Sequence, residues 1–291
     1  MTFPVLDSYL TQLRTAEGEN NKLWIDNQGR VQGKFLNCSL SSVFQPITSL
    51  NGENLLGFEA HAYSYSPLDR GLSVWQLLMN AATDDESIEL DRLARMIHVI
   101  NFFRQPEQKD SMIFIDVHDR LLTAVSSNHG AAFRRIVTSL GLPVSRMVLQ
   151  LPNTKPSRSW ALSQVVDNYK LNGFPVATRA GNIEEALDQA ESLRPNLIRL
   201  DISKIGNGER LTRLIECTAA VSVKLIFSRV EYHNELELLN EAASHSQRLM
   251  NHLFMQGSFI GEPQTDLFSH VLNVDTHGRT KSKLNLLSRI S

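Results

Sequence analysis

The chain has 291 residues, of which 42% are hydrophobic and 21% charged, so it is long enough for one large domain or two small ones. A formal charge of −2 gives no indication of a general affinity for nucleic acid or acidic membranes. The N-terminus lacks a basic segment followed by an apolar core, and no apolar run approaches the roughly 18 residues of a membrane-spanning helix. We therefore expect a cytoplasmic protein. Its two cysteines, Cys38 and Cys217, fit neither a disulfide framework nor a zinc site.

Residues 1–40 are predicted to form an N-terminal extension. An amphipathic pattern indicates a short helix near Leu6–Leu13, and Asn27-Gln28-Gly29 indicates a hairpin after it. Two apolar runs follow, Ser42–Thr48 and Leu55–Tyr63, and Asn51-Gly52 lies between them. Because Asn-Gly favours a tight hairpin turn, these two strands should be antiparallel.

Further along the chain, short runs rich in β-branched and aromatic residues alternate with helical patterns. The remaining expected strands are Met112–Val117, Met147–Leu151, Phe174–Thr178, Asn196–Asp201, Val223–Ser228 and Phe254–Gly257. The expected helices are Ser73–Ala82, Asp85–Arg104, Ala131–Leu140, Trp160–Leu171, Ile183–Leu193, Leu211–Ala220 and Asn234–Ala243. Alternation of this kind predicts a parallel sheet, and about eight strands favour a closed barrel. The predicted fold class is α/β, a modified TIM-like (βα)8 barrel with an antiparallel first strand, over residues 41–268.

Residues 269–291 form a basic C-terminal tail. Arg279, Lys281, Lys283 and Arg289 lie beside several leucines in this segment. A docked or fraying terminal helix and a partner-binding segment are both compatible with this composition.

Several motifs in the predicted barrel occur in the order and spacing of a known family. They are Phe44-Gln45-Pro46-Ile47, Gly57-Phe58-Glu59-Ala60-His61, Glu89-Leu90-Asp91-Arg92, Phe114-Ile115-Asp116-Val117, Leu197-Ile198-Arg199-Leu200-Asp201, and Gln256-Gly257 with Gly261 and Pro263. Together they resemble the EAL family of bacterial cyclic-di-GMP phosphodiesterases. The resemblance implies a modified barrel whose first strand is antiparallel, in agreement with the hairpin at Asn51-Gly52.

The resemblance also implies a two-metal catalytic site at the carboxyl ends of the strands, where two divalent cations would stabilise the attacking and leaving oxygens. The positions that correspond to this site, many of them altered, are Glu59, Asp116, Gln150, Arg179, Ala180, Arg199, Asp201, Ser228, Glu231 and Gln256. Arg179-Ala180 stands where the family has a paired Asp-Asp, and Ser228 replaces another Glu. Arg199 stands in place of the catalytic Lys.

These changes predict that the metal site and the catalysis are lost. A fixed arginine charge about 4 Å from a divalent cation costs on the order of 8 kcal/mol at an effective dielectric of about 20. We therefore expect no metal, no cofactor and no phosphodiesterase activity. Glu59 is expected to pair with Arg179 or Arg199, Asp201 to cap the helix that follows it, and His61 to be a packed or solvent-edge histidine.

Binding of the dinucleotide requires less than its hydrolysis. In the family that the chain resembles, the residues corresponding to Gln45 and Asp91 contact a guanine edge, and both are present here. An aspartate suits this role because its two oxygens accept the N1 and N2 hydrogens of guanine. The arginine that would meet a phosphate is replaced by Tyr63, so charge compensation would depend on Arg179, Arg199 or Arg229.

The sequence thus favours a catalytically inactive EAL-like barrel that acts as a regulatory, protein-interacting module with a partner of unknown identity. The alternative is a cyclic-di-GMP receptor that does not hydrolyse its ligand. A minor alternative is a residual phosphodiesterase with a single metal held by Glu59, Asp116 and Glu231. The loop that follows Arg179-Ala180 lacks the family's Gly-rich dimerisation signature, and the oligomeric state is left open.

Overall fold

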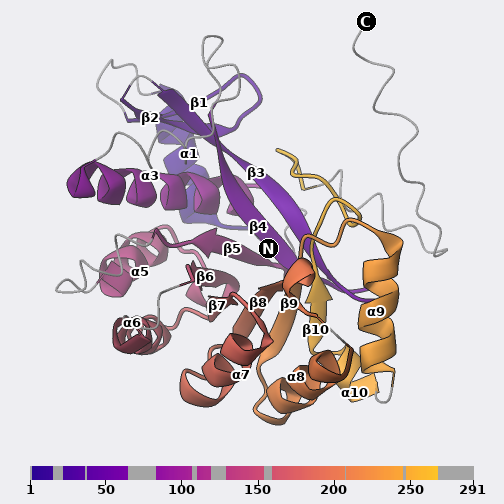
Figure 1. The fold of residues 1–291 in the computed structure, drawn as a ribbon. Coiled ribbons are helices and arrows are strands. Elements are labelled where there is room, and N and C mark those ends of the chain that lie inside the picture. The colour runs from indigo at the N-terminus through magenta and orange to yellow at the C-terminus, as the bar shows by residue number, and fades with distance from the viewer. Residues whose placement is uncertain are drawn as a thin grey trace, which may run out of the picture.

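The computed structural model describes residues 2–15, 22–36, 38–64, 83–106, 110–118, 129–153, 159–206, 208–244 and 247–267. Within them, eight strands close into a barrel with helices on its outside (Figure 1). The barrel strands are β3 (Cys38–Ser49), β4 (Leu55–Ser64), β5 (Met112–Asp116), β6 (Met147–Leu151), β7 (Val176–Ala180), β8 (Leu197–Asp201), β9 (Lys224–Ser228) and β10 (Leu253–Met255). The predicted fold class is confirmed.

Strand β3 runs antiparallel to both of its neighbours, β4 and β10, whereas the other neighbouring barrel strands are parallel. The hairpin between β3 and β4 turns at Asn51-Gly52, as predicted, and Gly52 adopts a φ of 71°. A left-handed residue at this point suits glycine, which has no Cβ to clash. The antiparallel first strand is therefore set by a local turn.

Helices cover the outside of the barrel (Figure 1). They are α3 (Asp84–Phe103), α5 (His129–Ser139), α6 (Ser159–Leu171), α7 (Ile183–Ser192), α8 (Gly208–Ala220), α9 (His233–Ala243) and α10 (Gln247–Met250), with short 3-10 helices at Val144–Arg146 and Ile202–Lys204. The predicted helix at Ser73–Ala82 and the basic tail lie outside the described residues. No helix in the described ranges is long and apolar enough to cross a membrane.

The N-terminal extension forms α1 (Pro4–Thr15), β1 (Leu23–Ile25) and β2 (Val31–Phe35), which confirms the predicted helix and hairpin. Strand β2 pairs with β3 and so continues the barrel sheet outward. Buried Asn101 of α3 fastens the hairpin, since its amide accepts from Val31 N at 2.8 Å and donates to Val31 O at 2.7 Å. The extension is thus attached to α3 as well as to the sheet.

Apolar side chains fill the barrel below the carboxyl ends of its strands. One cluster takes a single buried residue from each of seven strands: Ile47, Phe114, Val148, Ala177, Leu197, Ile226 and Phe254. Packing of this kind closes the interior, so polar side chains at the strand ends lie over an apolar floor. This arrangement positions the site described below.

Strand β7 differs from the prediction. The sequence pattern placed it at Phe174–Thr178, but the strand runs from Val176 to Ala180. Pro175 has no N–H to donate to the sheet, and the Phe174 N–H is used by Tyr169 O at the end of α6. Arg179 and Ala180 therefore belong to the strand itself. The connection to α7 is short, and Asn182 caps that helix by accepting from Glu185 N at 2.8 Å.

Candidate functional site

The barrel mouth is an open cleft with a buried carboxylate, Glu59 of β4, at its centre. The Arg199 Nη1 atom lies 2.8 Å from Glu59 Oε2, and Arg179 Nη2 lies 3.1 Å from Glu59 Oε1. The sequence predicted that Glu59 would pair with one arginine or the other, and it pairs with both. Two guanidinium groups therefore converge on one carboxylate.

Two amides complete the contacts of Glu59. Gln150 Nε2 donates to Oε1 at 2.9 Å, and Gln256 Nε2 donates to Oε2 at 2.7 Å. Each carboxylate oxygen thus accepts one hydrogen bond from an arginine and one from a glutamine. A buried charge needs such compensation, because desolvation without partners would neutralise it.

The environment of Glu59 favours its ionised form. Burial alone would raise the pKa of Glu59, but the charges of Arg199, His61 and Arg179 and the hydrogen bond from Gln150 bring its pKa far below the usual range. Opposite charges at this distance act in that direction. Glu59 is therefore an anion that the protein itself neutralises.

Arg179 extends the cluster to β5. Its Nη2 atom lies 2.6 Å from Asp116 Oδ1, and Gln150 Nε2 donates to the same oxygen at 3.0 Å. Burial raises the pKa of Asp116, the Glu59 charge acts in the same direction, and Arg179 opposes both. We call these six residues the strand-end network: Glu59, Asp116, Gln150, Arg179, Arg199 and Gln256.

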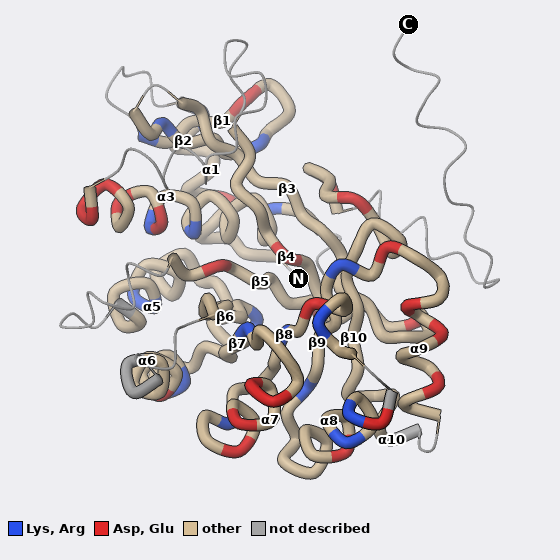
Figure 2. The backbone as a smooth tube through the Cα atoms, viewed as in Figure 1, with Lys and Arg blue, Asp and Glu red and all other residues tan. Residues whose placement is uncertain are grey.

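The sheet register brings these side chains together. Arg179 lies opposite Arg199 on neighbouring strands, and Asp116 lies opposite Gln150. The two carboxylates of the network therefore lie on neighbouring strands β4 and β5, and its two arginines on neighbouring strands β7 and β8 (Figure 2). Ala180, by contrast, is buried in the apolar cluster behind β7 and takes no part.

The remaining predicted positions line the rim of the same cleft. Asp201 caps the short helix after β8, as predicted, by accepting from Ser203 N at 2.9 Å, and it also pairs with Arg229 at 3.1 Å. Ser228 Oγ donates to Leu200 O at 3.4 Å. Glu231, two residues before α9 begins, also lines the rim.

The donor set does not fit a pair of divalent metals. Both oxygens of Glu59 already face cationic or amide donors, and a guanidinium group lies between Glu59 and Asp116. Across the described ranges, no three His, Cys, Asp or Glu side chains are placed to hold a metal ion. Glu59, Asp116 and Glu231, the three ligands of the single-metal hypothesis, form no such group in the described structure, and Arg179 lies between Glu59 and Asp116.

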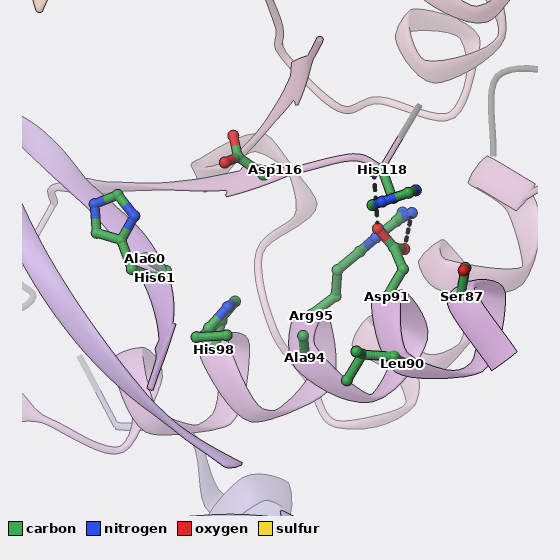
Figure 3. A pocket seen from close by; sticks show the side chains of 11 residues that line it. Ala60, His61, Ser87, Leu90, Asp91, Ala94, Arg95, His98, Asp116 and His118 are labelled. Atoms are coloured by element: carbon green, nitrogen blue, oxygen red, sulfur yellow. Dashed lines mark hydrogen bonds and ion pairs between the residues drawn. The ribbon is translucent and has the colours of Figure 1, made fainter. Parts of the chain in front are cut away.

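Asp91 lies away from the network, in a second pocket between β4 and α3 (Figure 3). Its carboxylate forms an ion pair with Arg95 one helical turn later and accepts from the His118 N–H at 3.0 Å. The cavity beside it measures about 20 Å³, which is about the room that one water needs. In this arrangement the carboxylate of Asp91 binds the protein's own groups.

Gln45 lines the main cleft, where its amide donates to Gly261 O at 3.0 Å. The two predicted nucleotide-binding residues therefore lie in separate pockets, which share His61, Asp116 and His118 as lining residues.

His61 is a solvent-edge histidine, 35% exposed, with Nε2 3.5 Å from Glu59 Oε2, which confirms its prediction. His98 of α3 is buried behind it, with Nδ1 2.7 Å from Ser42 Oγ (Figure 3). Burial and the nearby His61 lower the pKa of His98 to about 3. The sequence analysis missed His98, and it missed Arg95 although the spacing of four residues from Asp91 is typical of a helical ion pair.

Barrel closure, the antiparallel first strand and polar side chains at the strand ends together define a modified βα barrel with its candidate site at the carboxyl ends. The family model described as EAL domain matches residues 28–263. The chain therefore belongs to the EAL domain family.

Solved structures agree on the fold. The Klebsiella pneumoniae BlrP1 manganese/cyclic-di-GMP complex has a TM-score of 0.64 at 14% identity, with 78% of this chain and 56% of that chain covered. Bacillus subtilis YkuI, which has an EAL domain and was solved with its substrate cyclic-di-GMP and calcium, has a TM-score of 0.63 at 17% identity, with 78% and 55% covered. The FimX EAL domain of Pseudomonas aeruginosa bound to cyclic-di-GMP has a TM-score of 0.60 at 16% identity, with 78% and 91% covered. The chain thus spans little more than half the length of the first two. A comparison with curated proteins found no match.

Proposed function

We propose that this chain is a non-hydrolysing EAL domain that acts as a regulatory protein-interaction module. One observation carries the proposal. At the strand ends, where the resemblance implies two metal ions, Arg179 and Arg199 neutralise Glu59. Without a carboxylate cage for divalent cations, the site has no means to generate a hydroxide or to stabilise a leaving oxygen.

The strand-end network also explains why Glu59 remains useful without catalysis. Removal of its charge would leave two guanidinium groups facing each other at the barrel mouth, one of them almost fully buried. Breaking a buried pair by removing one partner is strongly destabilising. Glu59 therefore serves folding in this proposal, and recognition falls to the outer surfaces of the barrel.

A cyclic-di-GMP receptor is the second candidate, and one observation favours it. Arg199 Nε and Nη2 and Arg179 Nε are buried without hydrogen-bond partners among the described residues, so they could still donate to an oxyanion. The charge of the cleft opposes it. Three arginines and five carboxylates line the cleft, and each of these arginines already has a carboxylate partner.

The deciding experiment incubates the purified full chain with cyclic-di-GMP, with and without Mg²⁺ or Mn²⁺, and measures heat and product. We expect no hydrolysis under either condition. A second arm isolates tagged chain from its native lysate and determines whether a protein co-purifies in a fixed ratio.

The outcomes separate the candidates. Metal-dependent cleavage would refute the proposal outright. Micromolar binding with intact ligand would establish the receptor, and Gln45→Ala and Asp91→Asn should then abolish that binding. A lack of binding combined with a stoichiometric partner would support the interaction module, and absence of any partner would count against it.

A further inference from the structure

The N-terminal extension forms a pocket of its own, which we call the hairpin pocket. It lies between the end of α1 and the β1–β2 turn, and its lining residues are Leu13, Arg14, Trp24, Ile25, Asp26, Asn27 and Gly29. Every lining residue except Gly29 precedes residue 28, where the match to the EAL domain model begins. The pocket is therefore separate from the barrel mouth and is built largely from a segment outside the family match.

Two guanidinium groups converge at this turn. A Cβ built on Gly29 would lie 3.7 Å from Arg14 Nη2 and 3.8 Å from Arg104 Nη1, so these two nitrogens are at most 7.5 Å apart. An oxyanion bridges such a gap readily, with charge-assisted hydrogen bonds of about 2.8 Å to each side. Gly29 has a φ of 74° and leaves the approach free of a side chain.

Asp26, the carboxylate in the pocket lining, has its ion pair with Arg30 and not with Arg14 or Arg104. Asp26 is held by its own turn, where it accepts from Arg30 Nε at 2.7 Å and from Gln32 Nε2 at 2.9 Å, as well as from two backbone N–H groups. Arg14 has no hydrogen bond or ion pair with any residue that the structure describes. Arg104 donates through Nε to Asn101 Oδ1 at 3.1 Å, and its Nη1 atom lies beside Gly29, which lines the pocket.

Burial lowers the pKa of Arg104, whereas the nearby Asp266 and Asp26 oppose this shift, and Arg30 and Arg14 add to it. A cation disfavoured in this way gains from an added anion. Leu13, Trp24 and Ile25, all half-buried, contribute apolar and aromatic surface to the pocket lining.

We infer that the hairpin pocket binds a small organic anion, with a phosphate or carboxylate group between Arg14 and Arg104 and a ring or other apolar part against Trp24. Guanidinium groups suit such oxyanions because their planar N–H pairs match two oxygens at once. The site is independent of the function proposed for the barrel mouth, so either can fail alone.

Calorimetric titration of the full chain with phenyl phosphate tests this inference, with inorganic phosphate as a probe of the anionic contact alone. We expect phenyl phosphate to bind more tightly than inorganic phosphate. Arg14→Gln should weaken both at least tenfold, and Trp24→Leu should weaken phenyl phosphate alone. Arg14 is exposed and makes no structural contact, so this variant should fold normally.

Arg213→Gln is the matched control, since Arg213 is an exposed arginine on α8 and should not affect either ligand. Equal loss in the Arg14 and Arg213 variants would overturn the inference, because it would reflect net charge alone. Absence of binding at millimolar concentrations of both probes would overturn it as well. Unchanged binding in Arg14→Gln would place the anion elsewhere and reject the site.

Discussion

Replacement of Glu59 by glutamine tests the strand-end network most directly. The substitution keeps size and shape but removes the charge that pairs with Arg199 at 2.8 Å and with Arg179 at 3.1 Å. With charge centres about 4 Å apart and an effective dielectric of about 20, each pair contributes about 4 kcal/mol of Coulomb energy. The Arg179 side chain is 37% exposed, so solvent screens its share, whereas the Arg199 side chain is only 7% exposed.

In the native protein, the free-energy cost of burying these charges offsets part of this attraction. After the substitution the two arginines still carry their desolvation cost but have lost the attraction of Glu59. We therefore expect Glu59→Gln to lower the free energy of unfolding by about 3–5 kcal/mol, the range found when one member of a buried pair is removed. Urea denaturation at pH 7 measures it through the midpoint at constant slope. Glu184→Gln is the control, because its pair with Arg210 is largely exposed and should contribute less than about 1 kcal/mol.

The pH dependence gives a second readout with a defined sign. Since the pKa of Glu59 is lowered in the folded protein, its stabilisation is fully present above about pH 5 and is lost progressively as pH falls from the ordinary carboxylate range towards the lowered folded pKa. Glu59→Gln should lack that part of the acid-induced loss. If this variant loses no more stability than Glu184→Gln and keeps the wild-type acid profile, the arginine–glutamate network does not form as described.

Three further predictions concern other parts of the fold. His98 has a pKa of about 3 in the folded protein, below the unfolded value, so stability should fall by about 2 kcal/mol as pH drops from 7.5 to 5, and His98→Gln should remove that loss in urea denaturation. Asn101→Leu should cost about 2–4 kcal/mol, because it leaves the buried N–H of Val31 unpaired and its C=O with only the long hydrogen bond from Ser41 Oγ; thermal unfolding that matches wild type would contradict the attachment of the hairpin to α3. Gly57→Ala should cost about 3 kcal/mol or prevent folding, because its Cβ would lie 2.1 Å from Met112 O, and an unchanged unfolding midpoint would show that β4 and β5 can separate freely.

Local patterns in the sequence predicted most of the fold. Alternating strands and helices indicated the barrel, and Asn51-Gly52 indicated the antiparallel first strand, because both depend on short-range backbone preferences. The placement of β7 failed for a local reason as well, since Pro175 cannot donate within a strand and moves its start by two residues. A strand that begins after Pro175 places Arg179 within it.

The contacts of the candidate site depend on distant parts of the chain and were harder to predict. The ion pairs of Glu59 were predicted from the arginines that follow other strands in the sequence. The hydrogen bonds from Gln150 and Gln256 were not, because they depend on how closure of the barrel brings these two side chains to Glu59. Asp91 illustrates the opposite case. The spacing of Asp91 and Arg95 in the sequence is that of a helical ion pair, whereas the family resemblance predicted a contact between Asp91 and a nucleotide.

In this barrel mouth the positive charges beside Glu59 are arginine side chains, whereas a metal-dependent site takes its cations from solution. Arginines supplied by the chain are present whenever the protein is folded, so the neutralisation of Glu59 needs no metal from solution. An arginine that already pairs with Glu59 is less able to compensate the charge of an anionic ligand. The cleft lining also contains more carboxylates than arginines. The same contacts that stabilise the fold therefore weaken the case for a dinucleotide at the barrel mouth. By contrast, Arg14 at the hairpin pocket has no carboxylate partner within the described part of the chain, so an anion there would compete with no internal ion pair.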